Sequence, residues 1–198
     1  MGIEVHNRLG SVDDQELIRR LADVTIEYHP VSYSKNYDTV TYKTMELIAK
    51  LINKGKTNPK VIYTARYIAK STEQRDKMAE VQAIHEWVLQ HKHYANDPVN
   101  FELLTPADWL ISDIEKDGST TIDCDEAVIL EGSLLEALGY PVTLSVISTT
   151  MNPSDDYEHI YLSTVVDGQK VPLDPIMDDK PMGWELEGIY VKKKQICN

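Results

Sequence analysis

The chain has 198 residues, of which 42% are hydrophobic and 26% charged, and its net charge is −12. A surface this acidic repels phosphate backbones, so nucleic acid is excluded as an expected partner. No apolar run reaches the length of about 18 residues that a membrane helix needs, so no membrane contact is expected either. The length fits one domain with a substantial core.

In the first half of the sequence, the apolar residues follow the period of α-helices. This spacing predicts amphipathic helices separated by short polar segments. Pro59 lies near the first turn of one of them, and Thr105 followed by Pro106 predicts the N-cap and the first residue of another. The expected helices cover about residues 13–24, 39–53, 59–69, 73–91 and 105–111, with a loop over residues 28–36.

The second half changes from helix to strand. A helix is predicted to end at Gly139, a residue that commonly caps helix C-termini. Runs rich in β-branched residues follow it, and Asp167-Gly168 predicts a tight hairpin between the last two of them. The expected elements are a helix over residues 123–138 and strands over residues 142–148, 159–166 and 170–173.

This order predicts an α+β fold, in which one helix packs on a small antiparallel sheet. We expect residues 56–198 to form the core and residues 1–55 a helical extension, the two making one compact unit. No signal peptide is expected, which favours a cytoplasmic protein, or a virion-associated one if it is phage-encoded. Of the two cysteines, Cys197 is next to the last residue, where chains fray, so a disulfide with Cys124 is not expected. The basic run Lys192–Lys194 is expected to be a solvated tail.

Cys124 is the first candidate for chemistry. Asp123 and Glu126 resemble a capping box, which would put Cys124 in the first turn of a helix, where the dipole favours an anionic sulfur. The alternative is that Cys124 is a small buried hydrophobe, the usual state of a cysteine outside disulfides. Asp123, Asp125 and Glu126 also oppose a thiolate, because carboxylates beside a thiol favour its protonated form. A reactive Cys124 therefore needs a cationic partner.

His159 and Asp174 could complete such a site. His159 begins a predicted strand just after a polar loop, where scaffolds often hold catalytic groups, and its imidazole could serve as base and acid for the thiol. Asp174 ends the neighbouring strand and could accept the second ring N–H of His159, which would fix the tautomer. The alternatives are an ordinary polar histidine at a strand end and an Asp-Pro turn.

Three blocks of sequence in this order resemble the transglutaminase-like superfamily, a Cys-His-Asp class with papain-like architecture. The resemblance covers about residues 61–183. It implies that Cys124 begins a helix, that the sheet supplies His159 and Asp174, and that the three form a catalytic triad. The blocks are Asp123-Cys124-Asp125-Glu126-Ala127 with Leu134 to Pro141, His159-Ile160-Tyr161, and Val171-Pro172-Leu173-Asp174-Pro175, preceded by Ile84 to Val88 and by Tyr94 with Asp97-Pro98.

The sequence departs from the family pattern beside the nucleophile. Many members have Gly-Asp-Cys, whereas here Thr121-Ile122 precedes Asp123-Cys124 and the glycine is displaced to Gly118. The backbone N–H of Cys124 is one candidate oxyanion donor, and a second donor stays unassigned.

The resemblance implies thiol-dependent acyl transfer on a protein or peptide amide. If water resolves the thioester of Cys124, the protein is a cysteine protease or amidase. If an amine does so, it is a transglutaminase. Hydrolysis is slightly favoured for a bacterial or phage member. The alternative from another class is a non-catalytic structural or binding module, such as a phage virion or assembly component. The oligomeric state stays open.

No cofactor or metal is expected. Some transglutaminases use calcium, but the acidic residues of the second half lack the spacing of a calcium loop. Three histidines near residue 90 do not share one helix face. Trp184 could wall a substrate groove or pack in the interior. The acidic residues are Asp155, Asp156, Asp178 and Asp179, and the histidines are His85, His91 and His93.

Overall fold

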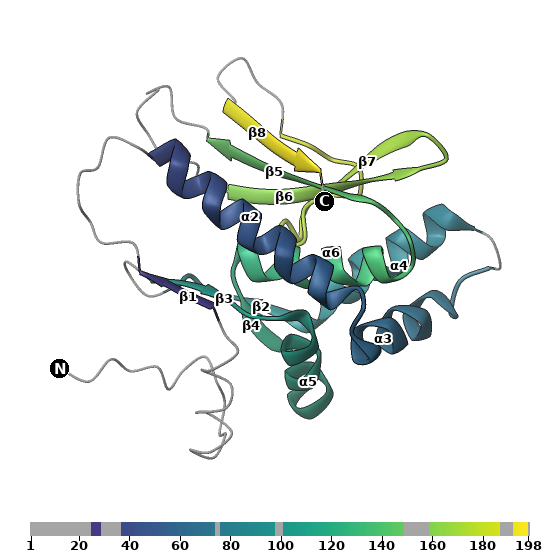
Figure 1. The fold of residues 1–198 in the computed structure, drawn as a ribbon. Helices are drawn as coiled ribbons and strands as arrows, with labels where there is room; N and C mark the ends of the chain where they lie inside the picture. The colour runs from purple at the N-terminus through teal and green to yellow at the C-terminus, as the bar shows by residue number, and fades with distance from the viewer. Residues whose placement is uncertain are drawn as a thin grey trace.

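The computed structural model describes residues 25–28, 37–73, 76–97, 101–148, 159–186 and 192–197. The helix expected over residues 13–24 lies outside this part, as does nearly all of the loop expected over residues 28–36. The expected α+β class is confirmed, because helices pack on a small antiparallel sheet (Figure 1).

The helices form where apolar periodicity predicts them, with ends set by local caps. Asn58 caps one helix by accepting the N–H of Lys60 at 2.9 Å, and Pro59 occupies its first turn. Asp76 caps the next by accepting the N–H of Ala79 at 2.9 Å, so this helix begins later than expected. The helices are α2 (Tyr37–Gly55), α3 (Pro59–Ala69), α4 (Lys77–His91), α5 (Ala107–Asp117) and α6 (Cys124–Ala137).

The expectation for the helix at residues 105–111 is wrong at both ends. Pro106, not Thr105, holds the N-cap position, and the Thr105 hydroxyl donates to the carboxylate of Glu126 instead. The helix continues to Asp117 and stops at Gly118, whose φ of 83° is left-handed. A hydrogen bond between distant segments thus replaces the local cap that the sequence indicates.

The main sheet has four strands in the order β7-β6-β5-β8, each antiparallel to its neighbours. Asp167 and Gly168 have φ values of 49° and 82°, which suits a primed two-residue turn, so the predicted hairpin is confirmed. The strands are β5 (Val142–Ser148), β6 (His159–Val166), β7 (Gln169–Leu173) and β8 (Lys192–Cys197).

The expected solvated tail is instead a strand. Lys192–Lys194 belongs to β8, which pairs with β5 so that Ser148 lies opposite Lys192 and Thr143 opposite Cys197. The backbone groups along the open edge of β5 gain hydrogen-bond partners in this way. Lysine is also a common residue on edge strands, where it discourages pairing with other chains.

Two further strand pairs join distant segments. β1 (Thr25–Tyr28) is antiparallel to β3 (Phe101–Leu104), and β2 (Lys92–Tyr94) is parallel to β4 (Thr120–Ile122). The sequence did not predict these strands, because three or four residues are too few to show an alternating pattern. The β2–β4 pair fixes the segment after α4 beside the segment that leads into α6.

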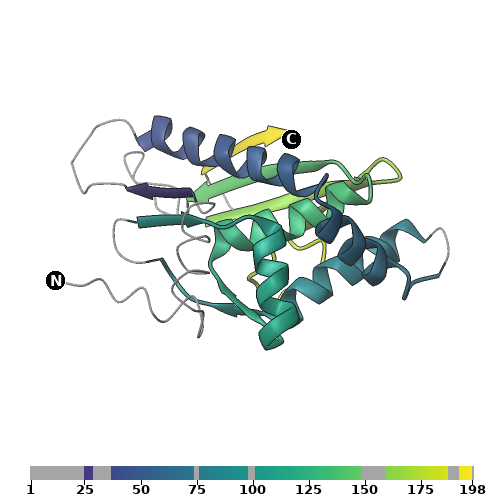
Figure 2. The same cartoon turned by 60° about the horizontal axis from the view of Figure 1, so that its bottom comes forward.

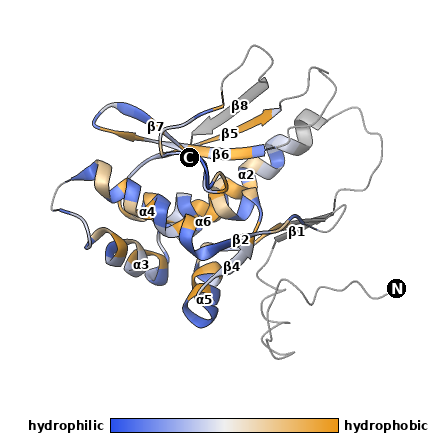
Figure 3. Cartoon of the chain, turned by 180° about the vertical axis from the view of Figure 1, so that it is seen from behind, coloured by the Kyte–Doolittle hydropathy of each residue, from blue (hydrophilic) through white to orange (hydrophobic). Residues whose placement is uncertain are grey.

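α6 lies at the centre of the molecule, packed against α2 on one side and against β6 on another. Its residues from Glu126 to Leu135 are all buried, and apolar colour is concentrated on α6, β5 and β6 (Figure 3). Ile48 and Ile52 of α2 are fully buried in the same core. The other helices surround this centre, with α3 and α4 together at one end of the molecule (Figure 2). The boundary at residue 55 stays a prediction.

We predict that Gly55→Ala destabilises the fold by about 1–3 kcal/mol through overpacking. A Cβ at position 55 would lie 2.3 Å from Oγ and 2.7 Å from Cβ of Ser133 on α6. Adding Ser133→Gly removes both clashing atoms, so the double variant should lose less stability than the two single variants summed. Urea unfolding of the four proteins measures this coupling, and additive losses would contradict the close contact of α2 with α6.

Candidate active site

Cys124 is the first residue of α6, and the chain before it sets its position. Asp123 has extended backbone angles, and its side chain accepts the N–H groups of Asp125 at 3.0 Å and Glu126 at 3.4 Å. This N-cap starts the helix at Cys124, whose side chain is half-buried. The sulfur therefore lies at the positive end of the helix dipole, as the sequence predicts.

The carboxylates beside the sulfur oppose that dipole. The thiol of Cys124 donates to Oδ1 of Asp125 over 3.7 Å. A carboxylate that accepts this bond favours the protonated thiol over the thiolate. A positive charge close to the sulfur is needed to reverse this preference.

His159 and Asp174 form a short hydrogen bond. The two residues come together because β6 begins at His159 and β7 ends one residue before Asp174, with Leu162 paired to Leu173. Nε2 of His159 lies 2.7 Å from Oδ2 of Asp174, and the two side chains are only 14% and 7% exposed. When Nε2 donates its proton to the carboxylate, Nδ1 is the nitrogen left with a lone pair.

Asp174 also stabilises the turn that its Asp-Pro pair predicts. Its Oδ1 accepts the N–H of Ile176 at 3.4 Å, and its backbone carbonyl accepts the N–H of Met177 at 3.2 Å. These bonds fix the direction of the carboxylate toward His159. The two interpretations of Asp174, turn residue and histidine partner, therefore both hold.

An ion pair between a buried lysine and an exposed aspartate joins the segment that leads to Cys124 to the segment after Asp174. Lys92 of β2 has a side chain only 3% exposed, and its Nζ lies 2.6 Å from Oδ1 of Asp178. β2 pairs with β4, which leads directly to Asp123 and α6. The turn that carries Asp174 is thus anchored to the strand pair before the nucleophile. The contact between Cys124 and His159 that a triad requires stays a prediction.

A pocket of about 240 Å³, counting its open mouth, adjoins the histidine and aspartate. Trp184 is in its wall, under the ammonium of Lys180 at 5.5 Å from the ring centroid, which favours the groove-wall interpretation of this tryptophan. The apolar and aromatic side chains that line the pocket beside His159 and Asp174 are Ile147, Tyr161, Met177, Trp184 and Leu186.

Glu185 also lines the pocket, but its carboxylate is paired with Lys170. Its Oε1 accepts the hydroxyl of Tyr161 at 2.5 Å and the ammonium of Lys170 at 2.9 Å. Burial and this carboxylate raise the pKa of Tyr161 far above its ordinary value, so the phenol stays protonated. Apart from the His159–Asp174 pair, the pocket therefore presents a mainly apolar surface with one carboxylate that is already paired.

Among the described residues, no group of three or more His, Cys, Asp and Glu side chains is placed to hold a metal ion. Asp178 pairs with Lys92 and Asp179 with Lys180. Asp155 and Asp156 lie outside the described part of the chain. None of the helices described is long and apolar enough to cross a membrane.

Two polar pairs that each include a buried side chain were not predicted. One is Lys92 with Asp178, and the other is His85 of α4 with Glu131 of α6, which are 3.0 Å apart. A single acidic residue inside the apolar run of residues 127–135 was a signal for the second pair. No comparable signal marks Lys92, whose burial depends on a strand that the sequence does not reveal.

Several solved structures resemble this chain at low identity. A candidate protease from Parabacteroides distasonis is 16% identical with a TM-score of 0.45, over 64% of this chain and 25% of its own. A candidate cysteine protease from Cytophaga hutchinsonii is 14% identical with a TM-score of 0.44, over 70% of this chain and 48% of its own. LapG from Legionella pneumophila is 15% identical with a TM-score of 0.39, over 68% of this chain and 76% of its own.

The chain thus spans a quarter of the first of these proteins and about half of the second. Two of the three are described as proteases. No protein-family model matches the chain, and no curated protein matches it in sequence.

We predict that Asp125→Asn makes Cys124 react about three- to tenfold faster with iodoacetamide near neutral pH, because it removes a carboxylate that favours the thiol. Mass spectrometry would follow labelling at Cys124 over a pH series, and the midpoint should move to lower pH. Asp117→Asn, at an exposed position on α5, is the matched control and should leave the rate unchanged. An unchanged rate in Asp125→Asn would show that Asp125 does not restrain the sulfur.

Proposed function

We propose that this chain is a thiol-dependent amide hydrolase in which Cys124, His159 and Asp174 form the triad. The observation that carries the proposal is the 2.7 Å hydrogen bond from the His159 ring to Asp174. That bond leaves Nδ1 of His159 as the nitrogen for the sulfur and stabilises the imidazolium that the sulfur needs. The start of α6 supplies the second favourable charge, from its dipole.

In this proposal, Nδ1 of His159 takes the proton of the Cys124 thiol, and the thiolate attacks the carbonyl carbon of an amide. A C–S bond forms, and the C–N bond then breaks as His159 returns the proton to the leaving amine. The product of this half-reaction is a thioester on Cys124. Water then attacks the thioester and loses a proton to His159, the C–S bond breaks, and a carboxylic acid leaves.

Hydrolysis and amine transfer differ only in the group that resolves the thioester. The pocket beside His159 has an open mouth, so water can reach this side of the imidazole. Exclusion of water is what amine transfer requires. We therefore favour hydrolysis, which makes the chain a cysteine protease or amidase rather than a transglutaminase.

The pocket supports a substrate with an apolar side chain beside the reacting amide. Its lining is aromatic and aliphatic apart from the catalytic pair and Glu185, whose charge Lys170 offsets. An apolar side chain of the substrate would bury surface there without leaving a polar group unpaired. A carboxylate on the substrate would meet no cationic group among the residues that line the pocket except His159, whose ring is already paired with Asp174.

One observation favours a function of another class. The thiol of Cys124 donates to Asp125, a contact that suits an inert cysteine. In that case the chain is a non-catalytic structural or binding module, for example in a phage virion. The two proposals differ in whether Cys124 reacts faster than an ordinary thiol.

We predict that the protein releases amine from peptide amides faster than it incorporates a fluorescent amine into protein. Cys124→Ala should abolish both activities, and Asp174→Asn should lower kcat by about 10²- to 10⁴-fold because the histidine loses its orienting partner. Asp179→Asn, at an exposed position in the same segment, is the control and should retain full activity. Faster amine incorporation would favour the transglutaminase. Inactivity toward both substrates, with slow labelling of Cys124, would favour the non-catalytic module.

We predict that peptides with Leu or Phe beside the reacting residue are cleaved at least about tenfold more efficiently than those with Asp, as judged by kcat/KM. Trp184→Ala should reduce this preference mainly by raising KM for the apolar peptides, because it removes part of the pocket wall. Val165→Ala, at an exposed position on β6, is the control. If Trp184→Ala lowered kcat/KM equally for apolar and acidic peptides, the pocket would not bind the side chain beside the reacting amide.

A further inference from the structure

α3 presents two tyrosines to solvent. Tyr63 and Tyr67 are 72% and 69% exposed, and their rings stack with centroids 6.5 Å apart and an interplanar angle of 17°. Because they are four residues apart, they lie one turn from each other on the same face of the helix. No other large hydrophobic side chain in the described part of the chain is as exposed. α3 thus carries an aromatic surface that the fold leaves uncovered.

The same face of α3 is basic. Arg66 and Lys70 are exposed, and with the two tyrosines they fall within an arc of about 100° around the helix axis. The buried residues of α3 lie on the opposite side of the helix, where they pack in the core. Four exposed side chains therefore form one surface, which we call the α3 face: Tyr63, Arg66, Tyr67 and Lys70.

Positive charge is concentrated in this part of the chain. Residues 47–72 contain six of the 20 Lys and Arg residues and none of the 32 acidic residues. Lys56 and Lys60 are already paired, because each lies 3.0 Å or less from a carboxylate on α6 or α5. Among the residues described, Arg66 and Lys70 have no carboxylate partner. Their charges are therefore available to a molecule that binds on the α3 face.

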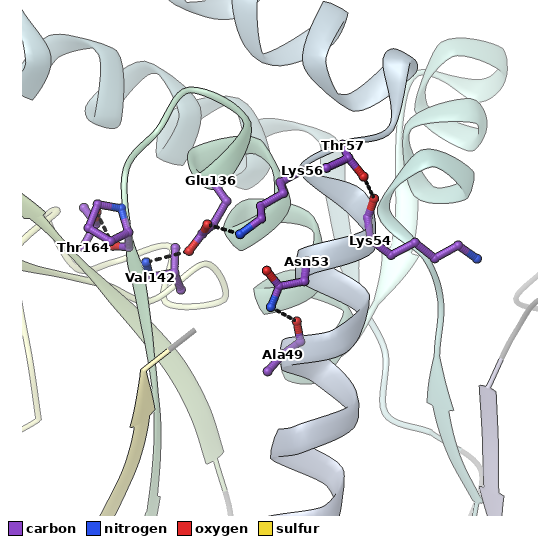
Figure 4. Close-up of polar contacts among 9 residues, drawn as sticks. Ala49, Asn53, Lys54, Lys56, Thr57, Glu136, Val142 and Thr164 are labelled. Atoms are coloured by element: carbon purple, nitrogen blue, oxygen red, sulfur yellow. Dashed lines mark hydrogen bonds and ion pairs between the residues drawn. The ribbon is translucent and has the colours of Figure 1, made fainter.

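The α3 face is separate from the proposed active site. Figure 4 shows the ammonium of Lys56, just before α3, at the carboxylate of Glu136 near the end of α6, and the two groups are 3.0 Å apart. Glu136 is twelve residues after Cys124, which is about 18 Å along the helix axis. α3 therefore begins at the end of α6 that is away from the sulfur, and a partner on its outer face leaves the site open.

We propose that the α3 face is a docking site for an acidic segment of a partner protein that also carries a large apolar side chain. Tyrosine and arginine are among the residues that contribute most to binding at protein interfaces. The stacked rings cover the apolar side chain at little cost in conformational entropy, and Arg66 and Lys70 pair with carboxylates beside it. The face spans two helical turns, about 10 Å, so a short segment covers it. This role goes beyond the proposed hydrolysis and does not depend on it.

Three other occupants fit the α3 face less well. The net charge of −12 repels nucleic acid, and two unpaired cations are too few to offset it. A helix that binds a membrane surface turns a broad apolar face outward, whereas the apolar face of α3 is buried in the core. A second copy of the chain, related by a two-fold axis at this face, would bring the same cations together and be repelled.

The test begins with a phage-displayed library of random peptides of about 16 residues, long enough to cover two helical turns, selected on the biotinylated full-length protein. We expect the selected peptides to combine Asp or Glu with Leu, Phe or Trp. The strongest binder is then labelled with a fluorophore and titrated with the protein by anisotropy. Its Kd should rise at least about threefold when salt is raised from about 0.05 M to about 0.3 M, because salt screens exposed charges.

Substitutions on α3 locate the binding. Tyr67→Ala and Arg66→Glu should each weaken binding of this peptide at least about tenfold. Tyr42→Ala and Lys43→Glu make the same changes at exposed positions on α2, and these matched controls should leave Kd unchanged. Circular dichroism checks that each variant is folded. Tyr63→Ala gives the same test at the neighbouring ring if Tyr67→Ala does not fold.

Reversal of charge on both partners gives the final check. A peptide with Lys in place of its Asp and Glu should bind Arg66→Glu/Lys70→Glu more tightly than it binds the unmodified protein. The proposal is overturned if no acidic peptide is selected, or if the α3 variants leave binding unchanged. It is also overturned if single-stranded DNA or phosphatidylserine vesicles bind the α3 face more tightly than the peptide, or if Tyr67→Ala abolishes self-association. Cys124→Ala should bind the peptide unchanged, so a failure of the proposed hydrolysis leaves this result intact.

Discussion

The burial of the middle of α6 on every side is the constraint from which the rest of the site follows. Residues from Glu126 to Leu135 are enclosed, and at Gly132 a Cβ would lie 2.7 Å from Cδ1 of Ile52 on α2. A helix packed this closely has little freedom to slide or rotate. Cys124 therefore has a defined position at the N-terminal end of α6, which is half open to solvent.

The net charge of this molecule is −12, and the side chain of Lys92 is buried. Lys92 pairs with Asp178, just after the turn of Asp174. Lys92 lies on a strand upstream of the nucleophile, and its partner lies in the segment that follows the sheet hairpin. This ion pair thus connects the two segments that carry the proposed triad.

Elements with strong local signals were predictable. The Asp167-Gly168 turn needs left-handed backbone angles, which these residues accept readily, and so the hairpin between β6 and β7 was visible in the sequence. Asp123 marks the start of α6 for a similar reason, because its side chain caps the helix locally. β8 was missed because the charge of Lys192–Lys194 suggests solvent, while its pairing depends on the open edge of a strand far back in the chain.

The sequence by itself determined the helix that begins at Cys124, the hairpin that brings His159 near Asp174, and the acidic surroundings of the sulfur. Each depends on residues close together in the chain, whose caps, turns and periodicity act locally. Only the tertiary structure decided that Asp174 is held at 2.7 Å from His159, that Lys92 is buried against Asp178, and that Glu131 meets His85. These contacts join segments far apart in the sequence, and only the packing of the whole core specifies which of them meet.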